Sequence, residues 1–137
     1  MAASQYDFKI EQGSSFRMSL IYKDSNGTAI DLANYCARLV WKTNTNVTQT
    51  FSSENSDYST YKLFIETPST DGKITFLLPA STTNSYGFST AKYDLELQDT
   101  SSLLYTEGGP ETFRILFGNI QVVKRYSKSS DLLDCST

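Results

Sequence analysis

The sequence contains no histidine, and it has only two cysteines, Cys36 and Cys135, among its 137 residues. Without an imidazole, the chain cannot use histidine as a general base, a proton shuttle or a zinc ligand. Two cysteines are too few for the disulfide framework of a small secreted domain. We therefore predict two free thiols, as is usual in a reducing compartment.

Long apolar segments and an excess of basic residues are also missing. The 12 basic residues stand against 15 acidic ones, giving a net charge of −3, whereas a nucleic-acid-binding domain usually presents a basic face. Residues 1–7 have neither the basic start nor the apolar stretch of a signal peptide. No apolar run approaches the ~20 residues of a membrane-spanning helix. We predict a protein made in the cytoplasm that has neither nucleic acid nor membrane as its partner.

Motifs for catalysis and for metal binding are absent as well. The chain has no Gly-x-Ser-x-Gly nucleophile elbow, and a nucleophilic serine would have no histidine to activate it. The run Asp24-Ser25-Asn26-Gly27 begins like a calcium loop, but the later ligands, including the final glutamate, are missing. A hairpin turn explains this run better. The sequence predicts no catalytic residue, no cofactor and no metal site, and therefore a protein that is not an enzyme.

Alternation of apolar and polar residues, the pattern of half-buried β-strands, recurs along the chain. It is clearest where Ala91, Tyr93, Leu95 and Leu97 alternate with charged or polar residues. Other stretches that read as strands are 16–22, 35–42, 62–66 and 73–78. A further stretch, 113–123, is apolar on both faces for part of its length, which indicates a central strand or one whose outer face meets a partner. Gly118 within it marks a bulge or a close backbone approach.

The single helical signal is short and covers 79–84, where Pro79 suits a first helical turn. About seven or eight short strands separated by turns favour an all-β, antiparallel sandwich, with a barrel as the second choice. We predict one β-sandwich domain over 1–126 and a polar C-terminal tail over 127–137. The polar segment 43–59 and the tail are expected to be loosely held and to become ordered only in an assembly.

Aromatic residues are abundant, at 13% of the chain. Most of them fall on the inward sides of predicted strands, but five tyrosines lie near loops or element ends: Tyr6, Tyr58, Tyr61, Tyr86 and Tyr126. Exposed aromatic rings can stack on sugars or anchor a protein interface. Packing against a sheet edge explains the same positions, so both interpretations stay open.

Six blocks follow one another in a distinctive order along the chain: 6–16, 24–32, 35–39, 74–83, 91–99 and 114–122. They include Ile10-Glu11-Gln12-Gly13, Gly27-Thr28-Ala29-Ile30-Asp31-Leu32, Leu78-Pro79-Ala80, Tyr93-Asp94-Leu95-Glu96-Leu97 and Leu116-Phe117-Gly118-Asn119-Ile120-Gln121-Val122. This order resembles small virion structural proteins of tailed bacteriophages, and it is similar to the immunoglobulin-like amino-terminal domain of phage baseplate upper proteins. The resemblance covers about residues 6–124. It does not reach the tail, and the loop over 100–112 is longer than the usual hairpin of the family.

The resemblance implies a non-enzymatic virion protein with an immunoglobulin-like sandwich, present in multiple symmetric copies and docked on other virion proteins. Its expected place is the neck, tail or baseplate, where it would serve as an adaptor. The alternatives are a capsid decoration (cement) protein and a glycan-binding module for host attachment. The residues expected to contact partner proteins are Tyr6, Phe8, Tyr58, Tyr61 and Tyr126, whereas the glycan alternative would use Tyr58, Tyr61 and Tyr86.

Overall fold

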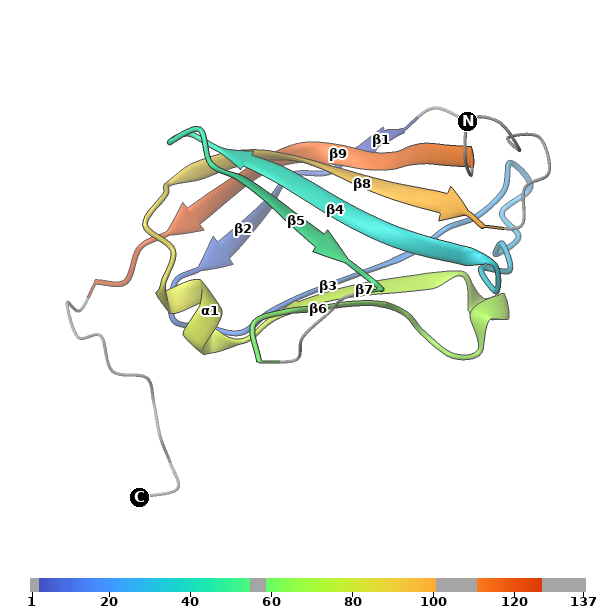
Figure 1. The fold of residues 1–137 in the computed structure, drawn as a ribbon, viewed down its shortest axis with the longest axis horizontal. Coiled ribbons are helices and arrows are strands. Elements are labelled where there is room, and N and C mark those ends of the chain that lie inside the picture. The colour runs from blue at the N-terminus through green and yellow to red at the C-terminus, as the bar shows by residue number, and fades with distance from the viewer. Residues whose placement is uncertain (1–2, 55–58, 101–110, 127–137) are drawn as a thin grey trace, which may run out of the picture.

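The computed structural model describes residues 3–54, 59–100 and 111–126, which form nine strands, one short α-helix and one 3₁₀-helix in two packed sheets (Figure 1). The strands are β1 (Ser4–Gln5), β2 (Phe8–Glu11), β3 (Phe16–Ile21), β4 (Tyr35–Thr43), β5 (Thr48–Ser52), β6 (Lys62–Ile65), β7 (Lys73–Leu78), β8 (Thr90–Asp99) and β9 (Glu111–Val123). The 3₁₀-helix η1 is Ser69–Asp71, and the α-helix α1 is Ala80–Asn84.

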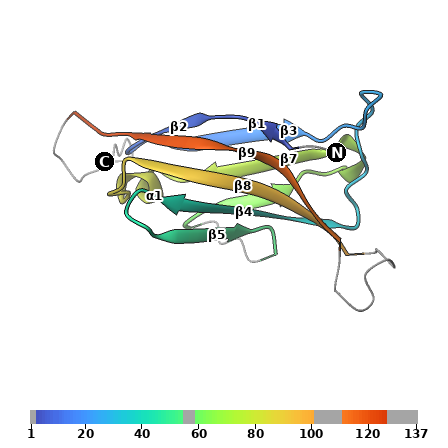
Figure 2. The same cartoon turned by 90° about the horizontal axis from the view of Figure 1, so that it is seen from above.

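The larger sheet has the order β1-β9-β8-β4-β5, with β2 also pairing β9, and the smaller sheet has the order β3-β7-β6. Figure 2 looks down on the larger sheet, with β2 and β5 on opposite sides. An immunoglobulin-like sandwich has the same arrangement, in which the chain passes from one sheet to the other between β3 and β4, between β5 and β6, and between β7 and β8. The predicted all-β sandwich with one short helix is confirmed.

The pairing of the first two strands is the exception in this otherwise antiparallel sandwich. Both β1 and β2 run parallel to β9, while the other described strand pairs are antiparallel. The chain leaves β2 through a turn at Gly13, whose φ is +85°, and enters β3 in the opposite sheet. Because no hairpin links β2 to β9, nothing forces these two strands to be antiparallel.

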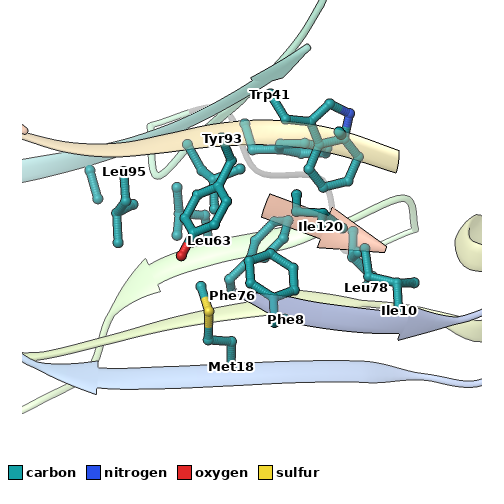
Figure 3. Packing of buried hydrophobic residues seen from close by; sticks show 14 of the residues in the cluster. Phe8, Ile10, Met18, Trp41, Leu63, Phe76, Leu78, Tyr93, Leu95 and Ile120 are labelled. Atoms are coloured by element: carbon teal, nitrogen blue, oxygen red, sulfur yellow. The ribbon is translucent and has the colours of Figure 1, made fainter. Parts of the chain in front are cut away.

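The core lies between the two sheets and takes side chains from both. Trp41 is fully buried, and its ring centroid lies 4.6 Å from that of Phe51 and 5.6 Å from that of Tyr86. Figure 3 shows Met18 and Phe76 of the smaller sheet facing this cluster. The alternation seen in the sequence of β8 is confirmed, since its alternate apolar side chains, Ala91, Tyr93, Leu95 and Leu97, are all buried.

Strand β9 lies between β8 and the β1–β2 edge of the larger sheet, and a register shift within it accounts for neighbouring apolar residues of opposite parity. An irregularity opposite Leu95 and Glu96 leaves Ile115 as an extra residue, so both Ile115 and Leu116 pack against the core. Gly118 marks a close approach, because a Cβ there would overlap the carbonyl oxygen of Tyr6. The central-strand interpretation is confirmed, and the bulge lies three residues before Gly118.

In its described part, 43–54, the polar segment is not the loosely held loop that we predicted over 43–59, because it contains strand β5. This strand forms a hairpin with β4 through a turn in which Asn46 has φ +65°. Phe51 is its one buried residue, and as an edge strand it pairs only with β4 among the described strands. A strand with so little buried surface resembles a loop in sequence. The predicted tail, 127–137, lies outside the described residues.

Candidate functional site

The structure separates the five residues that were expected to contact partners. Tyr6 is 50% exposed at the junction of β1 and β2, and Tyr126 is fully exposed after β9. Tyr61 is half-buried, and its ring packs edge-on against Phe51 at 4.8 Å. Tyr58 lies outside the described residues.

Two aromatic assignments need correction. Phe8 is only 7% exposed, because its side chain points from β2 into the core and its ring lies 4.9 Å from that of Tyr93. Tyr86 is also 7% exposed and packs against Trp41. Burial raises the pKa of the Tyr86 hydroxyl. Neither ring can therefore serve as a stacking platform for a sugar or as an anchor on a partner.

A different surface stands out on the outer face of the larger sheet. Lys9 of β2, Lys42 of β4 and Lys92 of β8 are exposed and line an open groove of about 730 Å³. Polar side chains from the same strands and the β4–β5 turn line it too, among them Asn44, Asn119 and Gln121. We call this surface the lysine groove, and define it by Lys9, Lys42, Asn44, Lys92, Asn119 and Gln121.

Strand register places these lysines together. Lys42 and Lys92 are directly opposite each other in the antiparallel β4–β8 pair, and Lys92 is opposite Asn119 of β9. Lys9 is opposite Gln121, one step further along β9 on the same face. Directly opposed side chains have their Cβ atoms about 4.5–5.5 Å apart. The two opposed lysines therefore repel each other.

Hydrogen bonds hold the backbone around the lysine groove in place. The Asp7 carboxylate accepts a hydrogen bond from the Asn119 N–H at 2.8 Å, and the Tyr93 hydroxyl donates to the Tyr6 carbonyl at 2.5 Å. At the other side, the Asn44 side-chain amide donates to the Ser89 hydroxyl at 3.2 Å. The groove is thus built on a hydrogen-bonded sheet, from which the long lysine side chains extend into solvent.

Charge pairing differs between the lysine groove and the rest of this sheet face. Further along the same outer face, Arg38 pairs with Glu96 and Arg114 with Asp94, each at 3.2 Å. Within the described ranges, none of the three groove lysines forms an ion pair with a carboxylate. The one acidic residue among the groove-lining side chains is Asp7. The groove therefore carries a net positive charge on a protein that is acidic as a whole.

On the outer face of the smaller sheet, one carboxylate lies between two basic side chains. Glu66 lies 3.6 Å from the Lys73 amine and 3.9 Å from the Arg17 guanidinium. It also accepts a hydrogen bond from the Thr75 hydroxyl. This hydrogen bond is the main cause that holds the pKa of Glu66 below its ordinary value, and the positive charges of Lys73 and Arg17 lower it further. This face holds a connected polar network, in which Glu66 offsets one of the two positive charges of Arg17 and Lys73.

Lysine ammonium groups flanked by side-chain amides suit carboxylate-bearing partners, because both donate hydrogen bonds to carboxylate oxygens. Sequence reasoning missed this site. The alternation in β4 and β8 shows that Lys42 and Lys92 face outward, but only the register of the two strands reveals that they are opposed.

The described part of the chain holds no group of three or more histidine, cysteine, aspartate or glutamate residues that could bind a metal ion. Cys36 is half-buried on β4, and its thiol donates to the Gln98 amide oxygen at 3.6 Å. Burial raises the pKa of the Cys36 thiol, with a smaller contribution from Glu54. Cys135 lies outside the described residues. Among those described, no helix is long and apolar enough to span a membrane.

Comparison with known proteins adds little to this description. The chain matches no family model and no curated protein. One solved structure similar to it is the RIG-5 IG1 homodimer, at 11% sequence identity and a TM-score of 0.44, covering 89% of this chain and 90% of that chain. So distant a likeness says nothing about function.

Proposed function

We propose that this protein is a non-enzymatic structural component of a tailed-phage particle, and that it docks through the lysine groove onto an acidic protein surface. Its place in the particle is an adaptor at the neck, tail or baseplate, with capsid decoration as the alternative position. Symmetric particles hold many copies of such a component, and many modest contacts then combine into a durable attachment.

The observation that carries this proposal is the opposed pair Lys42 and Lys92, exposed on a rigid sheet without an acidic neighbour in ion-pair contact. Like charges directly opposite each other destabilise a sheet. A carboxylate-rich partner would remove this repulsion on binding, so the pair costs stability in the free protein and contributes to association in the complex. The order of sequence blocks described above supports the phage assignment.

The glycan-binding alternative has less support. Of its three aromatic residues, Tyr86 is buried and Tyr61 packs edge-on against Phe51. Tyr58 lies outside the described residues. The exposed polar surface of the groove is lined by amines and amides, which favour a carboxylate-rich protein surface.

The test is to purify particles of the phage that encodes this chain and to treat them with a carbodiimide, which joins lysine amines to carboxylates in direct contact. We expect the chain to be a particle component, with cross-links from Lys42 and Lys92 to acidic residues of a virion protein. Lys23, an exposed lysine beyond β3, serves as the comparison and is expected to cross-link less often.

Cryo-electron microscopy of the same particles then locates the chain. Density at the neck, tail or baseplate supports the adaptor, and density on the capsid lattice supports the decoration protein. Absence of the chain from every particle would overturn the proposal. So would cross-links that avoid both groove lysines.

A further inference from the structure

Charge is divided between the two ends of the sandwich. The lysine groove lies at the end where β4 finishes and β8 begins, on the left in Figure 1. The opposite end holds the loops at 22–34, η1, the end of β8 and the beginning of β9. Five carboxylates lie there: Asp24, Asp31, Asp71, Asp99 and Glu111. We call this the acidic end.

Hydrogen bonds bring the parts of the acidic end together. The Asp31 carboxylate accepts from the Ala33 N–H at 3.0 Å and from the Ser69 hydroxyl at 2.9 Å, which ties the loop before β4 to η1. The Thr100 N–H donates to the Asn34 carbonyl at 2.8 Å, which ties the end of β8 to the same loop. The carboxylates are thus displayed on linked segments.

The acidic end repeats, with the opposite sign, the arrangement of the lysine groove. Asp99 of β8 is directly opposite Glu111 of β9, just as Lys92 of β8 is directly opposite Lys42 of β4. Burial raises the pKa of the Tyr35 hydroxyl, and the nearby charges of Asp99 and Glu111 raise it further. Lys23 also lies at this end, in a hollow shared with Arg114, which pairs with Asp94, while Lys73 pairs with Glu66.

The two ends do not neutralise each other within one molecule. Lys92 and Asp99 are seven residues apart on β8, a separation of about 23 Å at the usual rise of a strand. The Debye length in physiological salt is about 8 Å, so exposed charges at this distance are almost completely screened from each other. Neither end therefore reduces the charge of the other.

We infer that copies of this chain associate head to tail, with the acidic end of one copy seated on the lysine groove of the next. The inference rests on the proposed function, because it names the acidic surface that the groove binds. The two contacting surfaces are different, so the interface is heterologous and generates a ring if it closes or a filament if it does not. Such an interface suits a component that is present in many symmetric copies.

Sedimentation velocity on the purified chain tests the inference. In about 20 mM salt, we expect the mass to rise with concentration above the monomer mass of 15.3 kDa, and in about 0.5 M salt to return to it, since exposed charges are screened there. A chain that stays monomeric in low salt up to about 0.5 mM would overturn the inference, because exposed charges attract each other most strongly when little salt screens them.

Complementary variants test the head-to-tail geometry. Lys42→Glu/Lys92→Glu removes the groove and keeps the acidic end, and Asp71→Lys/Glu111→Lys does the reverse. Each variant alone is expected to be monomeric, and their mixture is expected to form a 1:1 dimer that grows no further. A mixture that stays monomeric would refute the geometry. So would either variant assembling like the wild type.

A matched single substitution separates this contact from a general effect of net charge. Lys42→Glu and Lys23→Glu change the net charge equally, but Lys23 lies at the acidic end. We expect Lys42→Glu to weaken self-association at least tenfold and Lys23→Glu to strengthen it. Equal weakening by both would contradict the inference. If the chain does not self-associate but its groove lysines cross-link to a different virion protein in particles, the head-to-tail inference is wrong and the proposed function is supported.

Discussion

Reversing the charge of Lys42 should stabilise the fold while it impairs the proposed function. Lys42→Glu replaces the repulsion between Lys42 and Lys92 by a cross-strand attraction. Opposite-charge pairs contribute about 0.2–1 kcal/mol, and like-charge pairs are destabilising. Removing a repulsion and adding an attraction of that size together give about 0.4–2 kcal/mol. Because both side chains are exposed, solvent screening keeps the effect in the lower part of this sum. We expect a gain of about 0.5–1 kcal/mol in the free energy of unfolding.

For a domain whose size lies between about 100 and 150 residues, a gain of this size corresponds to a rise in Tm of about 2–5 °C. Thermal denaturation followed by circular dichroism, at micromolar concentration in low salt, measures it. The difference should shrink as salt is added, because the pair is exposed.

The reverse change at the partner position provides the control. Lys92→Glu alone should stabilise as Lys42→Glu does, whereas the double variant restores like charges and should return the Tm to the wild-type value. This double-mutant cycle isolates the pairwise interaction. A double variant more stable than both single variants would refute the reasoning, since the gain would then come from net charge rather than from the opposed pair.

Three further changes test other parts of the structure. Gly118→Ala should cost about 2–3 kcal/mol, because its Cβ would overlap the Tyr6 carbonyl oxygen; amide hydrogen exchange should show faster exchange in the first strands, and wild-type protection would contradict this. Tyr86→Phe should leave the free energy of unfolding in urea unchanged or slightly higher, because the buried hydroxyl has no hydrogen-bond partner among the described residues; a clear loss of stability would show that the hydroxyl is bonded. Glu66, whose pKa is lowered mainly by the Thr75 hydroxyl, contributes stability above its unfolded-state pKa and loses it as the pH falls through the lower folded-state pKa; Glu66→Gln should therefore show a smaller drop in Tm between about pH 5 and pH 3 than the wild type.

Much of the fold is already determined by the local sequence. Alternation places Tyr93 and Leu95 inside, and turn residues such as Gly27, with φ +81°, end the strands where expected. Proline before a short polar segment is enough to predict α1. These features depend on residues within a few positions of one another, so they can be read without knowing which strands pair.

The edge strand β5 could not be predicted from its own residues. Its residues are mostly polar because only Phe51 is buried, and its strand conformation depends on pairing with β4. Phe8 and Tyr86 were misread for a related reason. Whether an aromatic ring near the end of an element is exposed depends on what the rest of the chain places over it.

The sequence by itself determined the class of the fold, the strands with a buried face and the absence of histidine chemistry, because each follows from composition or short-range periodicity. Tertiary structure alone decided the candidate site. Lys9, Lys42 and Lys92 are up to 83 positions apart in the chain, and they share a surface only because β2, β4 and β8 belong to one sheet in a particular register. A shift of one residue would turn each side chain to the other face, so pairing and register create both the lysine groove and its separation from the acidic end.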